Sequence, residues 1–172
     1  ESAIKNATAN GTGLLIRDDD HYQTNFEDGQ GSVGEWAART AGTHGNALGV
    51  SICSSATAYE QTAVTTTSGT EALGQTIISV TDASTINVGD IVNFGETFEY
   101  ETTARNTTDN TITIKLLDDP NGAGLQSQIT SGTSIRRRWR FYDLFDGAPG
   151  TSAYATQNTR GNNDEIHIVV YD

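Results

Sequence analysis

The sequence has one cysteine, two prolines and no methionine. The single thiol, Cys53, excludes an internal disulfide and a zinc site built from cysteines. Its apolar neighbours indicate a small buried side chain. No apolar stretch approaches the ~18 residues of a membrane-spanning helix, and no signal-like leader is recognisable. We therefore expect no membrane insertion. A start at Glu1 without Met, and an end on a strand-like stretch, predict a piece of a longer protein.

Basic residues are also scarce. Ten Lys and Arg stand against 22 Asp and Glu, so the formal net charge is -12 and the pI is about 4.4. Nucleic-acid binding over a broad surface needs a basic field, and the charge balance therefore excludes that class. The acidity itself favours solubility.

Glycine is abundant, with 18 residues, and it is accompanied by many Thr, Ser and Asn. This composition favours short strands and turns over long helices. Between 66 and 132, four strand-like runs alternate with turn signals at the spacing of a small barrel or sandwich. The runs cover 76–81, 90–94, 97–105 and 111–117.

The flanking sequence predicts a second kind of domain. A helix is expected near 33–39, and strand-like runs occur at 14–16, 48–54, 135–142 and 165–171. Insertions are tolerated where the two ends of a surface loop lie close together. We therefore predict an α+β fold: a mixed sheet with a short helix, in a discontinuous domain of residues 1–65 and 133–172, interrupted by an outward-facing all-β module at 66–132.

No stretch carries a catalytic or metal-binding pattern. The run from Asp18 to His21 lacks the ligand spacing of a calcium loop, and we expect a solvated acidic turn there. The run from Asp118 to Gly122 is typical of a turn, because Pro, Asn and Gly each favour turn geometry, and we expect a turn there in preference to a cation site. Without a nucleophile elbow or a phosphate loop, we expect no enzyme, no metal and no cofactor. Zinc-type spacing is also missing among the three histidines, which are His21, His44 and His167.

The sharpest local feature is the run from Arg136 to Arg140, with Trp139 inside it. On a strand, alternate side chains share a face, so Arg136, Arg138 and Arg140 would lie opposite to Arg137 and Trp139. A basic stripe with an aromatic residue can grip nucleic acid, but the chain as a whole is strongly acidic. Pairing with acidic surface, of the same chain or of a neighbouring subunit, is favoured over a plain solvated strand. Arg136, Arg138 and Arg140 are therefore candidate subunit-contact residues.

Three stretches resemble contractile phage tail sheath proteins, most closely those of large contractile-tailed phages. In one, an aromatic-Ala pair is followed by a Gly turn, Gly-Asn and an apolar strand. In another, a loop rich in Gly, Pro and Ser leads to an acidic pair and a strand ending in Asp. The stretches follow the family's order and lie outside 66–132. They read LLIRDDDHY (14–22), GEWAARTAGTHGNALGVSIC (34–53) and FDGAPGTSAYATQNTRGNNDEIHIVVYD (145–172).

The resemblance implies a structural virion protein. Sheath subunits polymerise as stacked six-fold rings around the tail tube and contract on a baseplate signal, which drives the tube through the host envelope. The implied partners are further copies of the chain, the tail tube and the baseplate. The implied location is the virion tail, after synthesis in the host cytoplasm. Sheath proteins continue into a core domain and stitching arms, so the resemblance implies an internal fragment that is monomeric by itself.

Two other functions stay open at this stage. The first is a virion surface β module that binds carbohydrate at the host cell surface, with aromatic side chains as stacking platforms. The second is a hydrolase with an Asp/Glu pair that spacing does not reveal. The missing catalytic signature argues against the hydrolase. The aromatic candidates for sugar stacking are Tyr22, Trp36, Tyr59, Tyr100 and Tyr154.

Overall fold

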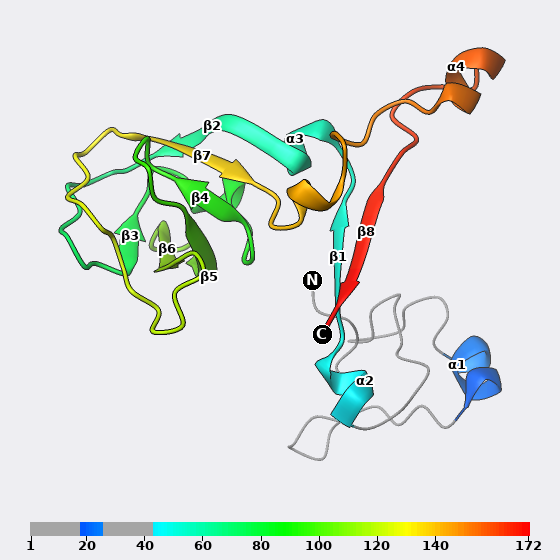
Figure 1. The fold of residues 1–172 in the computed structure, drawn as a ribbon, viewed down its shortest axis with the longest axis horizontal. Coiled ribbons are helices and arrows are strands. Elements are labelled where there is room, and N and C mark those ends of the chain that lie inside the picture. Colours follow the sequence, from blue (N-terminus) through cyan, green and yellow to red (C-terminus); the bar gives the residue numbers. More distant parts are fainter. Residues whose placement is uncertain (1–17, 26–42) are drawn as a thin grey trace. The chain divides into compact units, whose positions relative to one another are not determined.

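The computed structural model describes residues 18–25 and 43–172 (Figure 1). The strand expected at 14–16 and the helix expected near 33–39 lie outside these residues. Contacts divide the chain into two compact units, Glu1–Ile52 with His167–Asp172, and Cys53–Ile166. The mixed α+β class predicted from the sequence is confirmed, with mostly antiparallel strands and few short helices.

The described part of the first unit holds two short helices and a two-stranded sheet. Its elements are α1 (Asp19–Asn25), α2 (Thr43–Ala47), β1 (Gly49–Cys53) and β8 (His167–Tyr171). β1 and β8 pair, and Figure 1 shows them running in opposite directions. A Cβ at Gly49 would collide with the ring of Tyr171, so a larger residue there would force this ring to move.

The acidic turn expected at Asp18 to His21 is instead the start of α1. The Asp18 carboxylate accepts a hydrogen bond from the backbone N–H of His21 at 2.8 Å. An Asp side chain that satisfies a free N–H in the first turn is a common helix cap. Asp18 therefore caps the start of α1.

The second unit is built around a six-stranded antiparallel sheet in the order β2-β7-β4-β5-β6-β3. Short helices precede the sheet, follow β3 and follow β7. The strands are β2 (Glu60–Thr66), β3 (Ile77–Ser79), β4 (Ile91–Asn93), β5 (Tyr100–Asn106), β6 (Thr111–Leu116) and β7 (Ser134–Arg138). The helices are α3 (Ala56–Tyr59), η1 (Ala83–Thr85), η2 (Tyr142–Leu144) and α4 (Ala153–Asn158).

The two end strands of this sheet meet and close it into a barrel. Thr67 bridges Val80, and the backbone N–H of Ser68 donates to the Ser79 carbonyl at 2.9 Å. Register shifts in β2 and β5 mark bulges, which sharpen the curvature that closure requires. Of the two predicted alternatives, the barrel is the one that forms.

The barrel interior is filled by alternate side chains of the strands. In β6, Ile112 and Ile114 are buried, while Thr111 and Thr113 on the other face are half-buried. Period-two patterning therefore places the apolar set inside. The core consists of Ile78, Val80, Ala83, Ile86, Val92, Phe94, Tyr100, Ile112, Ile114, Leu125, Ile129 and Ile135.

Several predicted boundaries need correction. The run at 135–142 was assigned to the discontinuous domain, but β7 pairs with β2 and β4 inside the six-stranded sheet. The compact unit is therefore Cys53–Ile166 rather than 66–132. That this unit is an insertion within a parent domain stays a prediction. Two short helices that the sequence did not predict are also present, α2 and α4.

Candidate interaction surface

β7 carries arginines on both of its faces. Ile135 and Trp139 are buried and Arg137 is nearly so, whereas Arg136 and Arg140 are exposed. Arg138 lies on the outer face with Arg136 and Arg140, and its side chain is 16% exposed. The alternation predicted from the sequence is therefore confirmed. The outer arginines and the inner Arg137 perform different tasks.

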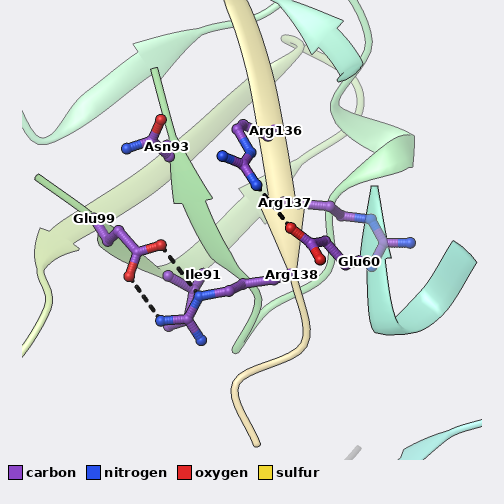
Figure 2. A pocket seen from close by; sticks show the side chains of 7 residues that line it. All are labelled: Glu60, Ile91, Asn93, Glu99, Arg136, Arg137 and Arg138. Atoms are coloured by element: carbon purple, nitrogen blue, oxygen red, sulfur yellow. Dashed lines mark hydrogen bonds and ion pairs between the residues drawn. The ribbon is translucent and has the colours of Figure 1, made fainter. Parts of the chain in front are cut away.

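The outer arginines pair with carboxylates of the same unit, as Figure 2 shows for two of them. Arg136 Nη2 lies 2.7 Å from Glu60 Oε1 on β2. Arg138 binds Glu99 in a bidentate manner, at 3.1 Å from Nε and 2.7 Å from Nη2. Parallel N–H···O bonds of this kind are among the stronger ion pairs in proteins.

The third outer arginine belongs to a chain of charges. Arg140 Nη1 lies 3.0 Å from Glu101 Oε1, and Lys115 Nζ lies 2.9 Å from the other oxygen of that carboxylate. Together with the two preceding pairs, these residues form a surface that we call the charge ladder. It comprises Glu60, Glu99, Glu101, Lys115, Arg136, Arg138 and Arg140.

Strand register explains the charge ladder. Ile91 on β4 lies opposite Arg138 on one side and Glu101 on the other. Because β4 presents the uncharged Ile91 and Asn93 here, the long arginine side chains of β7 reach across it to the carboxylates at the start of β5. Arg138 lowers the pKa of Glu99, chiefly through the hydrogen bonds to its carboxylate. Its guanidinium also lies 4.2 Å from the centre of the Tyr142 ring, within cation–π range.

Arg137 turns to the other side of β7 (Figure 2). It donates to the carbonyl oxygens of Thr57 at 2.9 Å and Ala58 at 3.3 Å, and lies 3.4 Å from Asp90 Oδ2. Burial raises the pKa of Asp90, and the N–H of Asn87 and the charge of Arg137 oppose that rise. These partners are distant in sequence, so local patterning gave no signal for them.

A shallow depression lies over the charge ladder. Its cavity volume is about 10 Å³, far below the ~300–1,000 Å³ of ordinary small-molecule sites. Its walls are already joined by the ion pairs of Arg136 and Arg138. The geometry therefore favours contact with a surface over capture of a small ligand. The lining residues are Glu60, Ile91, Asn93, Glu99, Arg136, Arg137 and Arg138.

The other candidate residues are dispersed. His21, His44 and His167 lie in α1, α2 and β8. Within 18–25 and 43–172, no three His, Cys, Asp or Glu side chains gather as metal ligands. Asp119 accepts the N–H groups of Asn121 and Ala123 at 2.9 and 2.8 Å, which lowers its pKa and closes the predicted turn.

Two of the five aromatic residues proposed for sugar stacking are buried. Tyr100 is a core residue, and the Tyr59 hydroxyl donates to the Tyr142 carbonyl at 2.6 Å. Neither ring can serve as a platform, so this part of the carbohydrate hypothesis is wrong. Tyr154 is exposed, Tyr22 is half-buried, and Trp36 lies outside the described residues.

The chain was compared with known proteins. It matches no family model, no curated protein and no solved structure. In the described part of the chain, no helix has the length and apolar character needed to cross a bilayer.

Proposed function

We propose that this chain is a structural part of a contractile phage tail sheath. The subunit would polymerise as stacked hexameric rings around the tail tube, and their contraction would drive the tube through the host envelope. The observation that supports the proposal is the pairing of two strands that lie in sheath-like stretches. Two of the three sheath-like stretches, 34–53 and 145–172, contain β1 and β8, which pair in one sheet. The barrel unit, Cys53–Ile166, lies between β1 and β8 in sequence and includes most of the stretch 145–172.

A sheath subunit acts through its contacts. Rings that stack around a tube use heterologous interfaces, in which one patch of each copy meets a different patch of the next. Energy for contraction would be stored in contacts that improve when the rings rotate. The protein therefore needs complementary surfaces rather than a reacting group. Its partners would be further copies of itself, the tail tube and the baseplate, within a virion assembled in the host cytoplasm.

The charge ladder is the contact surface that we propose for a neighbouring subunit. Arg138 already donates two hydrogen bonds to Glu99 within the chain. Arg136 and Arg140 each have side chains about half exposed, at 51% and 46%. A guanidinium carries five N–H donors, so each can bind a second carboxylate from outside. The net charge of -12 makes acidic surface available on a neighbouring copy.

Charge reversal tests this contact. The double variant R136E/R140E of the complete gene product should assemble more slowly and at lower salt tolerance than the wild type, since attraction becomes repulsion. Arg160→Glu is the matched control for each of the single variants R136E and R140E, because it reverses one charge at an exposed arginine outside the charge ladder. Unaltered assembly of R136E/R140E would rule the contact out without touching the sheath proposal.

The sheath proposal itself is tested by the state of assembly. Sedimentation and light scattering would compare the 172-residue chain with the product of the complete gene. We expect the 172-residue chain to remain monomeric and the complete product to build tubes or polysheaths. A complete product that stays a small closed oligomer would contradict the proposal.

A further inference from the structure

The polypeptide approaches and leaves the barrel through two segments that touch each other. The incoming segment, 53–60, contains α3, and the outgoing segment, 137–145, contains η2. We call these two segments the neck. We propose that Arg137 is a latch that holds the neck closed, and that the neck opens as a unit while the barrel stays folded. This inference is independent of the sheath proposal.

Arg137 contacts all three parts that must stay together. It belongs to the outgoing segment, and it donates to the carbonyl groups of Thr57 and Ala58 in the incoming one. Its ion pair with Asp90 then ties both segments to the turn before β4. Carbonyl groups at the end of a helix need donors, and a cation is a favourable one. Without Arg137, the carbonyl groups at the end of α3 lose these donors.

Tyr59 of the incoming segment makes further hydrogen bonds to the outgoing segment. The backbone N–H of Trp139 donates to the Tyr59 carbonyl at 2.7 Å. The Tyr59 hydroxyl donates in return to the carbonyls of Tyr142 at 2.6 Å and Phe145 at 3.3 Å. The Trp139 ring packs 5.5 Å from the ring of Phe145. The three hydrogen bonds join the incoming segment to the outgoing one, and the ring contact lies within the outgoing segment.

The neck contributes no side chain to the barrel core, although Glu60, Arg137 and Arg138 belong to the ends of β2 and β7 and pair there. The twelve buried residues of that core all lie between 78 and 135, and none of the neck residues is among them. Segments with their own small set of contacts can open below the global unfolding free energy. The neck therefore has the construction of a separate opening unit.

An arginine at this position is unexpected on packing grounds. The flanking inward positions hold Ile135 and Trp139, and the Arg137 side chain is only 10% exposed. Its Nε has no hydrogen-bond partner among the residues that the structure describes. A buried ion pair is a weak source of net stability, but removal of one partner is costly. The pair is thus better suited to holding one defined closed state than to general stabilisation.

Cys53 provides the reporter for neck opening. It is the only cysteine of the chain, it has no exposed surface, and its thiol lies 3.5 Å from the Ser55 carbonyl. A thiol reagent would therefore label Cys53 only when its surroundings open. Because Cys53 is also the last residue of β1, amide exchange of β1 and of α3 would distinguish opening of the β1–β8 sheet from opening of the incoming segment. Amide exchange of Ile112 and Ile114, both in the barrel core, would report on the barrel at the same time.

The decisive variant is Arg137→Met, with Arg160→Met as its control at an exposed arginine outside the neck. We expect Arg137→Met to speed labelling of Cys53 by roughly tenfold or more, because a charged group that makes several hydrogen bonds is lost. Loss of a nearby positive charge would by itself slow the labelling, since a cation favours the thiolate. Faster labelling can therefore arise only from greater exposure. Arg160→Met should label at the wild-type rate.

Two results would overturn the proposal. One is an unchanged labelling rate in Arg137→Met. The other is faster labelling with equal loss of protection at Ile112 and Ile114, which would make the neck part of the barrel's global unfolding. If Arg137→Met does not fold, Tyr59→Phe decides by the same two readouts, since it removes only the hydroxyl bonds to the outgoing segment.

Discussion

Two adjacent isoleucines of β3 offer a direct test of the barrel. Ile78 has no exposed surface and belongs to the core, whereas its neighbour Ile77 is 54% exposed. Truncation of a fully buried Ile to Ala costs ~2–5 kcal/mol, because apolar contact is lost and a cavity remains. Truncation of the exposed neighbour should cost well under about 1 kcal/mol. We therefore expect Ile78→Ala to be the more destabilising substitution by a wide margin.

Urea unfolding followed by fluorescence measures the difference. With an m-value of ~1–3 kcal/mol/M, a loss of this size moves the midpoint of Ile78→Ala down by roughly 1–2 M. The midpoint of Ile77→Ala should move by a few tenths of that. Both m-values should stay at the wild-type value. A larger effect at Ile77 would refute the register of β3 against β6, because a shift of one residue exchanges the two faces of a strand.

Two further substitutions test the loop packing and the charge ladder. Gly124→Ala should destabilise the barrel by ~1–3 kcal/mol in the same urea assay, because any Cβ there collides with the backbone of residues 74–75. Gly147→Ala, where a Cβ meets nothing within 4 Å, should be neutral, and equal effects would refute this packing. Arg138 lowers the pKa of Glu99, so the ion pair stabilises the fold above the ordinary Glu pKa of about 4.3 and is lost as pH falls through the lower folded value. Glu99→Gln should therefore cost at most about 1 kcal/mol at neutral pH, since that carboxylate is 38% exposed. The cost should vanish once the pH is below the lowered folded pKa of Glu99, and a cost that does not change with pH would contradict the pairing.

The strands of the barrel were largely predictable from the sequence. The runs at 76–81, 90–94 and 111–117 contain β3, β4 and β6, and the run at 97–105 covers β5 except for its last residue, Asn106. Their apolar residues alternate, and Gly, Asp and Asn mark the turns, so local physics agrees with the fold. β1 and β8 carried the same kind of signal.

The missed elements lack such a signal. β2 contains Val64 as its only large apolar side chain, and it becomes a strand through its pairing with β7. α4 has six residues in a stretch rich in Gly, Thr and Asn, and the Ser152 hydroxyl starts it by accepting the N–H of Ala155. Tertiary pairing and a single cap decide these elements, and neither is visible in hydrophobic periodicity.

The charge ladder was half predictable. Alternation placed Arg136, Arg138 and Arg140 on one face, but it could not identify their partners within the chain. Glu99 and Glu101 are each 39 residues from the arginines that they bind, and only the order β7-β4-β5 brings them together. The inner role of Arg137 was missed for the same reason. Long-range register, which patterning does not encode, determined both.

The most direct test of the sheath proposal is immunogold electron microscopy with antibodies raised against the 172-residue chain. The particles would be those produced by the genome that encodes it. We predict labelling along the whole length of a contractile tail, in both its extended and its contracted states. Labelling confined to the capsid, to fibre tips or to the baseplate would contradict the account.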